Sequence, residues 1–241
     1  MTTNGHVTER LDPVHHANEP APTPPPVVAA EPASTTAHVE DFELPTTYLA
    51  VKYASSRALA AVLLVLLAPV FAIVAGLLRW KLGKGVLYRQ ARVGRNGETF
   101  EILKFRTMDA DRRASRVPVE QDRRQTHKSD NDPRHNALGR FLRKTSLDEL
   151  PQLWNVVRGD MTLVGPRPEL AEVADKYGFR DHPRHVVVPG ITGLWQVSEY
   201  RHELLHEHIH VDVDYVQQVS FGLDCKIIAR TLLLVVRPTG R

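Results

Sequence analysis

The sequence is nearly without cysteine, since Cys225 is the one thiol among 241 residues. A single cysteine excludes an internal disulfide and fits a reducing compartment. Basic residues are also scarce at the N-terminus, where the first 45 residues contain one, and no secretory signal is recognisable there. No motif typical of nucleic-acid-binding proteins is present, so we expect no nucleic-acid partner.

Charge and proline are distributed unevenly along the chain. The first 45 residues carry a net charge of −6 and the remainder carries +9, although the whole chain has +3. The same N-terminal segment holds eight of the 17 prolines and few large apolar residues. Such a segment cannot offset its ordering entropy by burial, so residues 1–46 are predicted to be a disordered acidic tail. The basic remainder suits an anionic membrane surface or phosphate-bearing substrates.

Charge is absent from the 21 consecutive residues Ala58 to Leu78, which Arg57 and Arg79 flank. An unbroken helix of this length would reach about 30 Å, roughly the hydrocarbon thickness of a bilayer. Pro69 removes a backbone hydrogen bond near the middle, which predicts a kink or break there. Because cations flank both ends, a re-entrant segment with both flanks in the cytoplasm is favoured, and a kinked single span is the alternative.

The residues after the apolar run predict a β-hairpin. Val86–Arg89 and Thr99–Phe105 are rich in alternating, β-branched and aromatic residues, and Asn96-Gly97 between them is a strong turn signal. Residues 109–134 are highly charged, which indicates a surface loop or short exposed helices. From Leu138 onward the apolar spacing becomes helical.

Two adjacent acids, Asp148 and Glu149, permit two interpretations. As structure, they begin a helix, either with Ser146 and Glu149 as a capping box or with Asp148 as the cap and Pro151 in the first turn. As chemistry, they suit metal-assisted phosphoryl transfer, in which one carboxylate attacks phosphorus or binds Mg²⁺. The other would then complete the metal shell or handle a proton.

A carboxylate that attacks an anionic phosphate needs cations around the phosphate oxygens. Lys104 and Arg106 lie at the end of the predicted hairpin, where alternation places both on one face. Arg167 lies between Pro166 and Pro168, which limit backbone freedom and hold its guanidinium group for a phosphate. For each cation, an ordinary solvated surface charge is the alternative.

Taken together, these segments resemble the bacterial monotopic phosphoglycosyl transferases, also called the bacterial sugar transferase family. The resemblance runs from about Lys52 to Val236 and rests on the joint order of several blocks. Besides the proline-broken apolar run, these blocks are Arg92-Val93-Gly94, Lys104-Phe105-Arg106-Thr107-Met108, Ser146 to Leu153, Asn155 to Met161, Val164-Gly165-Pro166-Arg167-Pro168, Pro189-Gly190-Ile191-Thr192-Gly193 and Asp212-Val213-Asp214-Tyr215.

The resemblance implies transfer of a sugar 1-phosphate from a UDP-sugar to polyprenyl (undecaprenyl) phosphate, which initiates polysaccharide or glycoconjugate synthesis. It implies Mg²⁺, a covalent sugar-phosphoryl intermediate on Asp148, and Glu149 assisting with metal or proton. It further implies Lys104, Arg106, Arg167 and Asp212 as substrate phosphate-binding residues. The expected location is the cytoplasmic face of the bacterial inner membrane, in contact with its lipids.

The chain departs from the family pattern before the Pro-Gly-Ile-Thr-Gly block. Relatives commonly carry Lys or Arg there, whereas this chain has Val188. Arg184 lies close enough in sequence to compensate for the missing phosphate contact.

Two other functions compete with this interpretation. His202-Glu203-Leu204-Leu205-His206 matches the zinc-protease pattern, in which two histidines on one helix face bind zinc. In a chain with 12 histidines the match carries little specificity. The second alternative is a non-catalytic membrane scaffold that recruits partners through its tail, and it predicts that Asp148 is dispensable.

We therefore expect an α+β, mostly helical, membrane-associated monotopic domain with a proline-broken re-entrant helix and a small β-hairpin. The expected order is a disordered tail at 1–46, a membrane-inserted segment at 47–85 and a catalytic domain at 86–241. The apolar C-terminal stretch from Lys226 to Val236 is compatible with a position along the membrane surface. The residues indicate neither a particular sugar nor an oligomeric state, and they assign no role to the His-rich segment 202–210.

Overall fold

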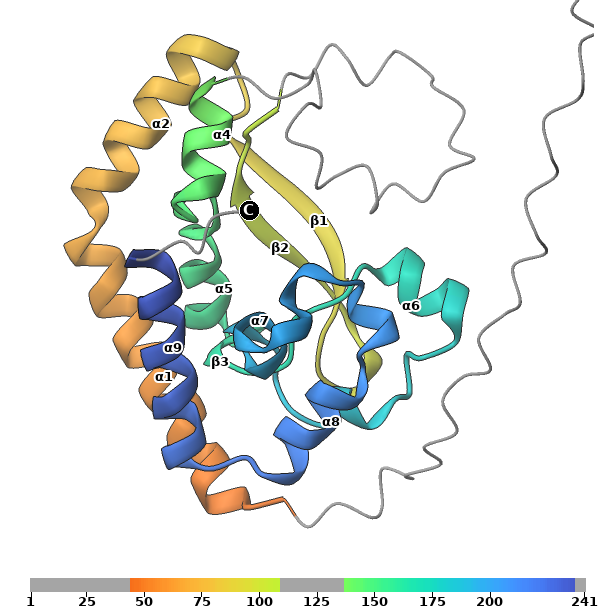
Figure 1. The fold of residues 1–241 in the computed structure, drawn as a ribbon. Helices are drawn as coiled ribbons and strands as arrows, with labels where there is room; N and C mark the ends of the chain where they lie inside the picture. The colour runs from red at the N-terminus through yellow and green to blue at the C-terminus, as the bar shows by residue number, and fades with distance from the viewer. Residues whose placement is uncertain (1–43, 109–136, 237–241) are drawn as a thin grey trace, which may run out of the picture. The chain divides into compact units, whose positions relative to one another are not determined.

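The computed structural model describes residues 44–108 and 137–236, which form helices around two small sheets (Figure 1). This arrangement confirms the mostly helical α+β class. The predicted acidic tail, apart from residues 44–46, and the predicted loop at 109–134 lie outside the described residues.

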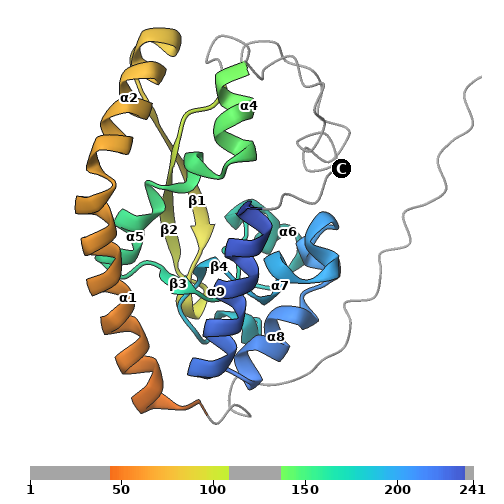
Figure 2. The same ribbon diagram turned by 60° about the vertical axis from the view of Figure 1, so that its left-hand side comes forward.

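The apolar run forms two helices, α1 (Thr46–Leu66) and α2 (Ala68–Leu82), with Leu67 between them. Pro69 lies in the first turn of α2, where its missing amide costs no hydrogen bond, so the predicted break is confirmed. In both ribbon views α2 continues beyond the end of α1 as a bent rod (Figures 1 and 2). Among the described residues, α1 is the one helix whose length and composition suit a membrane span. The re-entrant path stays a prediction.

The predicted β-hairpin is confirmed. Strand β1 (Leu87–Val93) pairs antiparallel with β2 (Thr99–Phe105). The turn places Asn96 at φ 55° and Gly97 at φ 75°, in the left-handed region that Asn-Gly adopts at little cost. The residues toward the C-terminal end of β2, including Lys104, therefore have a fixed position.

A second sheet pairs β3 (Thr162–Val164) in parallel with β4 (Gly190–Thr192). Parallel strands need a crossover, and here it includes α6 (Ala171–Tyr177) and the 3₁₀ turn η5 (Pro183–His185). The glycines of the two Gly-Pro motifs allow the strands to approach closely. A methyl group on Gly190 would lie 2.5 Å from the Thr192 carbonyl oxygen, and one on Gly165 would lie 2.6 Å from that of Val188.

Gly190→Ala is therefore expected to destabilise the protein by at least about 2 kcal/mol, because the added methyl meets backbone atoms that cannot move aside. In a domain of this size, the thermal unfolding midpoint should fall by roughly 4–8 °C. Gly222→Ala is the matched control, since no neighbouring atom lies within 4 Å of the place that its added methyl would take. An unchanged midpoint for Gly190→Ala would contradict the close approach.

The other helical elements follow in chain order. They are α4 (Ala137–Lys144), η4 (Leu147–Glu149), α5 (Gln152–Arg158), α7 (Leu194–Val197), η6 (Glu199–His202), η7 (Leu205–Glu207), α8 (His210–Gln217) and α9 (Phe221–Val236). The predicted onset of helix near Leu138 is confirmed.

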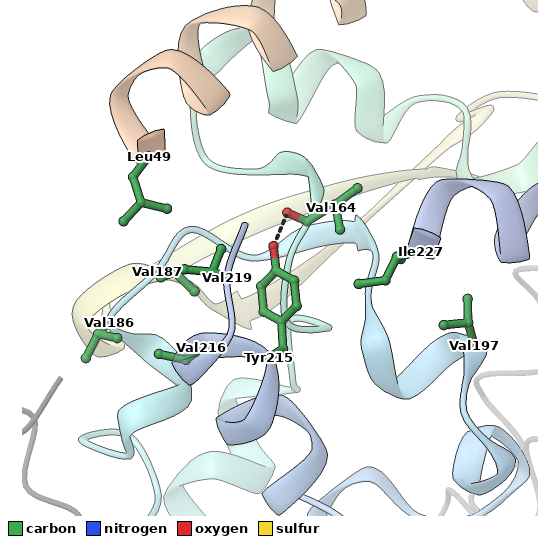
Figure 3. Close-up of a cluster of buried hydrophobic side chains, with 9 residues drawn as sticks. All are labelled: Leu49, Val164, Val186, Val187, Val197, Tyr215, Val216, Val219 and Ile227. Atoms are coloured by element: carbon green, nitrogen blue, oxygen red, sulfur yellow. Dashed lines mark hydrogen bonds between the residues drawn. The ribbon is translucent and has the colours of Figure 1, made fainter. Parts of the chain in front are cut away.

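One apolar core joins the start of α1 to the second sheet, α8 and α9. Figure 3 shows its nine buried side chains, among them Tyr215, whose hydroxyl lies 3.3 Å from the Val164 carbonyl oxygen. Beside this core, Lys52 forms a buried ion pair of 2.6 Å with Asp224 on α9. The first turns of α1 are thus anchored in the protein through both apolar and polar contacts.

Candidate active site

The two adjacent acids lie in a short turn between two helices. Ser146 follows α4 with φ 56° and makes no side-chain capping bond, and Pro151 precedes the first residue of α5. Neither of the two capping arrangements considered above therefore forms. Asp148 and Glu149 occupy the 3₁₀ turn η4, so neither carboxylate is engaged as a helix cap.

Asp148 is buried, with 8% of its surface exposed. Burial and the neighbouring Glu149 charge raise the pKa of Asp148 to about 6, although Lys104 and Arg143 oppose this shift. An oxygen with this pKa is a stronger base than an ordinary carboxylate, and it is still ionised at neutral pH. Asp148 thus has the properties of an activated oxygen nucleophile.

Glu149 is held in the ionised form. Lys104 Nζ donates to its Oε1 at 2.8 Å. Burial alone would raise the pKa of Glu149, but the charges of Lys104, Arg167 and Arg92 lower it to about 2. The two neighbouring carboxylates therefore have pKa values that are pushed apart, an arrangement typical of catalytic pairs.

Arg92 is a pocket residue that the sequence interpretation did not select, although it begins one of the quoted family blocks. Its Nη1 donates to the Pro168 carbonyl oxygen at 3.0 Å and lies 3.9 Å from Glu169 Oε1. Burial and the nearby Arg167 charge lower the pKa of Arg92 to about 10. Two guanidinium groups thus lie close enough to repel each other, which favours binding of an anion between or beside them.

A small pocket brings these cations together beside the acids. Its lining residues come from both sheets, α5 and the Gly-Pro-Arg-Pro loop. They are Arg92, Ile102, Lys104, Gln152, Arg167, Pro168, Gly190 and Ile191. The structure therefore unites Lys104 and Arg167, two of the predicted phosphate-binding residues, and adds Arg92 and Gln152 to them.

Two other predicted phosphate-binding residues lie elsewhere. Arg106 donates to the carbonyl oxygens of Lys84, at 2.9 Å, and Leu82, so its guanidinium group binds the C-terminal end of α2. Asp212 is fully buried and pairs with Arg184 at 2.6 Å. Arg184 is itself buried, so it does not supply the pocket contact that Val188 lacks.

The His-rich segment does not form the single helix that the zinc-protease pattern requires. The turns η6 and η7 are interrupted at Glu203, whose φ of −96° and ψ of −178° are extended. His206 instead stacks on Tyr177 with ring centroids 4.5 Å apart, and His208 stacks on Tyr200 at 4.3 Å.

The acid pair fits Mg²⁺ as a partial ligand set. Mg²⁺ prefers oxygen ligands and is commonly held by one or two carboxylates, with water and substrate phosphates completing its shell. Asp148 and Glu149 supply two such carboxylates. Within residues 44–108 and 137–236, no group of three or more metal-binding side chains lies close enough to hold an ion alone. Water and substrate phosphate oxygens would therefore complete the shell.

The raised pKa of Asp148 predicts that its replacement stabilises the protein. The folded state favours the protonated carboxyl between the ordinary pKa of 3.8 and the folded value of about 6, so stability falls as pH rises through this range. At pH 8, Asp148→Asn should be more stable by up to about 3 kcal/mol, and the difference should vanish near pH 4. Thermal unfolding at both pH values measures it. If Asp148→Asn were less stable than the wild type at pH 8, the claim that the folded state disfavours the ionised Asp148 carboxylate would be wrong.

Comparison with known proteins assigns the family. Residues 47–238 match the family model described as bacterial sugar transferase. Exopolysaccharide production protein ExoY of Sinorhizobium fredii is 38% identical over 190 residues, which cover 73% of this chain and 81% of ExoY.

Longer relatives match over part of their length. Galactosyl transferase CpsE of Streptococcus agalactiae is 41% identical over 66% of this chain and 36% of CpsE. UDP-glucose:undecaprenyl-phosphate glucose-1-phosphate transferase of Escherichia coli is 35% identical over 75% of this chain and 39% of that protein. The chain thus spans little more than a third of these two proteins. The match over most of its own length shows that the chain belongs to the bacterial sugar transferase family.

Proposed function

We propose that this protein transfers a sugar 1-phosphate from a UDP-sugar to polyprenyl phosphate, giving a polyprenyl-diphosphate sugar and UMP. The reaction would initiate polysaccharide or glycoconjugate synthesis at the cytoplasmic face of the bacterial inner membrane. The observation that carries the proposal is the Asp148–Glu149 pair, whose pKa values are pushed apart and whose Glu149 accepts a 2.8 Å bond from Lys104 of the pocket.

In the first step, an Asp148 carboxylate oxygen attacks the β-phosphorus of the UDP-sugar. The bond from that phosphorus to the bridging oxygen breaks, and its electron pair leaves with UMP. At neutral pH, Asp148 is largely ionised and needs no separate base. Lys104, Arg92 and Arg167 offset the negative charge of the diphosphate, which a carboxylate would otherwise repel.

In the second step, a phosphate oxygen of polyprenyl phosphate attacks the same phosphorus. The acyl phosphate bond to Asp148 breaks and the free carboxylate is restored. When bound to Asp148 and Glu149, Mg²⁺ would supply further positive charge at the phosphates. Glu149 keeps its ionised form through both steps because three cations stabilise its charge.

The apolar helices α1 and α2 support a site at a bilayer surface. Many of their large side chains are exposed, including Val65 at 74% and Trp80 at 85%. A re-entrant path for these helices would let a water-soluble donor and a lipid-borne acceptor reach one pocket. Two relatives have undecaprenyl phosphate in their names, which supports a polyprenyl phosphate as the acceptor of this chain.

The zinc-peptidase alternative is disfavoured because the His-rich segment does not form the helix that would align its two histidines. The scaffold alternative does not explain why the pKa values of Asp148 and Glu149 are shifted in opposite directions. The deciding experiment incubates the membrane-bound protein with a panel of UDP-sugars and undecaprenyl phosphate. Release of UMP and formation of a lipid-linked sugar are expected with at least one donor. Absence of UMP with every donor would contradict the proposed function.

A further inference from the structure

The carbonyl group of Arg167, which lines the pocket, is held by a buried ion pair. Nη2 of Arg184 contacts both the Arg167 carbonyl oxygen and Oδ2 of Asp212, the latter at 2.6 Å. The side chains of Arg184 and Asp212 are both 0% exposed. Neither side chain can therefore contact a substrate in this arrangement. Arg184 contacts Arg167 directly, and Asp212 is connected to Arg167 through the guanidinium group of Arg184.

The loop that carries Arg167 is fixed at its neighbouring positions as well. The Gly190 amide donates to the Pro166 carbonyl oxygen at 2.9 Å, and Arg92 donates to that of Pro168 at 3.0 Å. Arg184 supplies the contact to the central residue of this Pro-Arg-Pro segment. Three consecutive carbonyl groups are thus held by donors from separate parts of the fold.

Net stability does not explain why an ion pair occupies this interior position. Removing two charges from water costs about as much as their attraction returns, so a buried pair contributes little stability compared with apolar residues of similar size. A guanidinium group, however, can hold a carboxylate and a carbonyl oxygen at once in fixed directions. Fixing the Arg167 backbone is a use that an apolar pair could not provide.

We propose that Arg184 and Asp212 form a positioning pair, in which Asp212 orients Arg184 and Arg184 fixes Arg167 for the donor diphosphate. The inference rests on the proposed function. It gives Asp212 an indirect role through Arg184 and Arg167, in place of the direct phosphate contact that the family resemblance implied. A displacement of about 1 Å at such a contact can reduce activity roughly a hundredfold.

A double-mutant cycle on Asp212 and Arg167 tests this chain of contacts. With the UDP-sugar that the wild type uses, Asp212→Asn should raise the donor KM about tenfold, because Arg184 loses the charge of its ion-pair partner. In an Arg167→Ala background the same change should raise it less than about twofold, because the group to be positioned is gone. Fully additive effects would overturn the proposal. Asp175→Asn, at the exposed Arg180 ion pair, is the control and should leave KM unchanged.

A second variant separates positioning from folding. Arg184→Met with Asp212→Leu removes both charges, so the thermal unfolding midpoint should recover from the loss expected for Asp212→Leu alone. The donor KM should nevertheless stay raised about tenfold, since the Arg167 carbonyl contact is still missing. Recovery of both quantities would assign the pair a purely structural role and overturn the inference. If the double variant does not fold, the mutant cycle decides.

The wild-type protein distinguishes this inference from the proposed function. A wild type that releases no UMP from any UDP-sugar contradicts the function and, with it, the positioning pair. A wild type that turns over normally, combined with additive Asp212→Asn and Arg167→Ala effects, contradicts the positioning pair alone.

Discussion

Asp148→Asn is expected to release UMP at least about 1,000-fold more slowly than the wild type, because an amide cannot form the acyl phosphate bond. The substitution keeps the shape of the side chain and, at neutral pH, is expected to stabilise the fold. Loss of activity would therefore accompany a gain in stability. The measurement is the initial rate of UMP release with the preferred UDP-sugar and undecaprenyl phosphate.

Glu101→Gln serves as the matched control for this experiment. Glu101 lies on β2, and its exposed carboxylate forms a surface ion pair of 3.5 Å with Arg89. A surface pair of this kind contributes little, so UMP release should stay within about twofold of the wild type. Near-normal UMP release by Asp148→Asn would instead contradict Asp148 as the nucleophile.

Lys104→Met should lower kcat/KM for the UDP-sugar by about 100- to 1,000-fold. The change removes one of the cations that line the pocket and also the hydrogen bond to Glu149. Without Lys104, the pKa of Glu149 should rise, since Lys104 is its strongest lowering influence. Steady-state kinetics with varied donor concentration would measure the loss.

Arg106→Met is a sharp comparison, because Arg106 follows Lys104 by two residues and carries the same charge. Its contacts to the carbonyl oxygens of Leu82 and Lys84 predict a lower thermal unfolding midpoint, with kcat/KM for the UDP-sugar within about threefold of the wild type. If Arg106→Met lowered kcat/KM for the UDP-sugar as much as Lys104→Met, Arg106 would belong to the substrate site after all.

Local signals in the sequence were sufficient for the elements that depend on local chemistry. Asn96-Gly97 predicted the hairpin turn because few other pairs adopt two successive positive φ angles. Pro69 predicted the helix break because its ring and missing amide act within one turn. The family blocks also selected Lys104 and Arg167, which the fold then brings into one pocket.

Long-range contacts explain what the sequence did not predict. Strand alternation places Lys104 and Arg106 on one face, but it does not say that α2 ends opposite Arg106. The pairing of Asp212 with Arg184 depends on how α8 packs on η5, which no local pattern encodes. The sequence did not identify Arg92 as a pocket residue for the same reason, because its position depends on a contact with Pro168 of the Gly-Pro-Arg-Pro loop.

Chemical trapping with a UDP-sugar labelled at the β-phosphate tests the central claim most directly. In the absence of polyprenyl phosphate, the label should appear on a single peptide that contains Asp148, and addition of the lipid acceptor should remove it. Continued UMP release and lipid product formation, with no label bound to the protein at any time, would contradict the covalent mechanism.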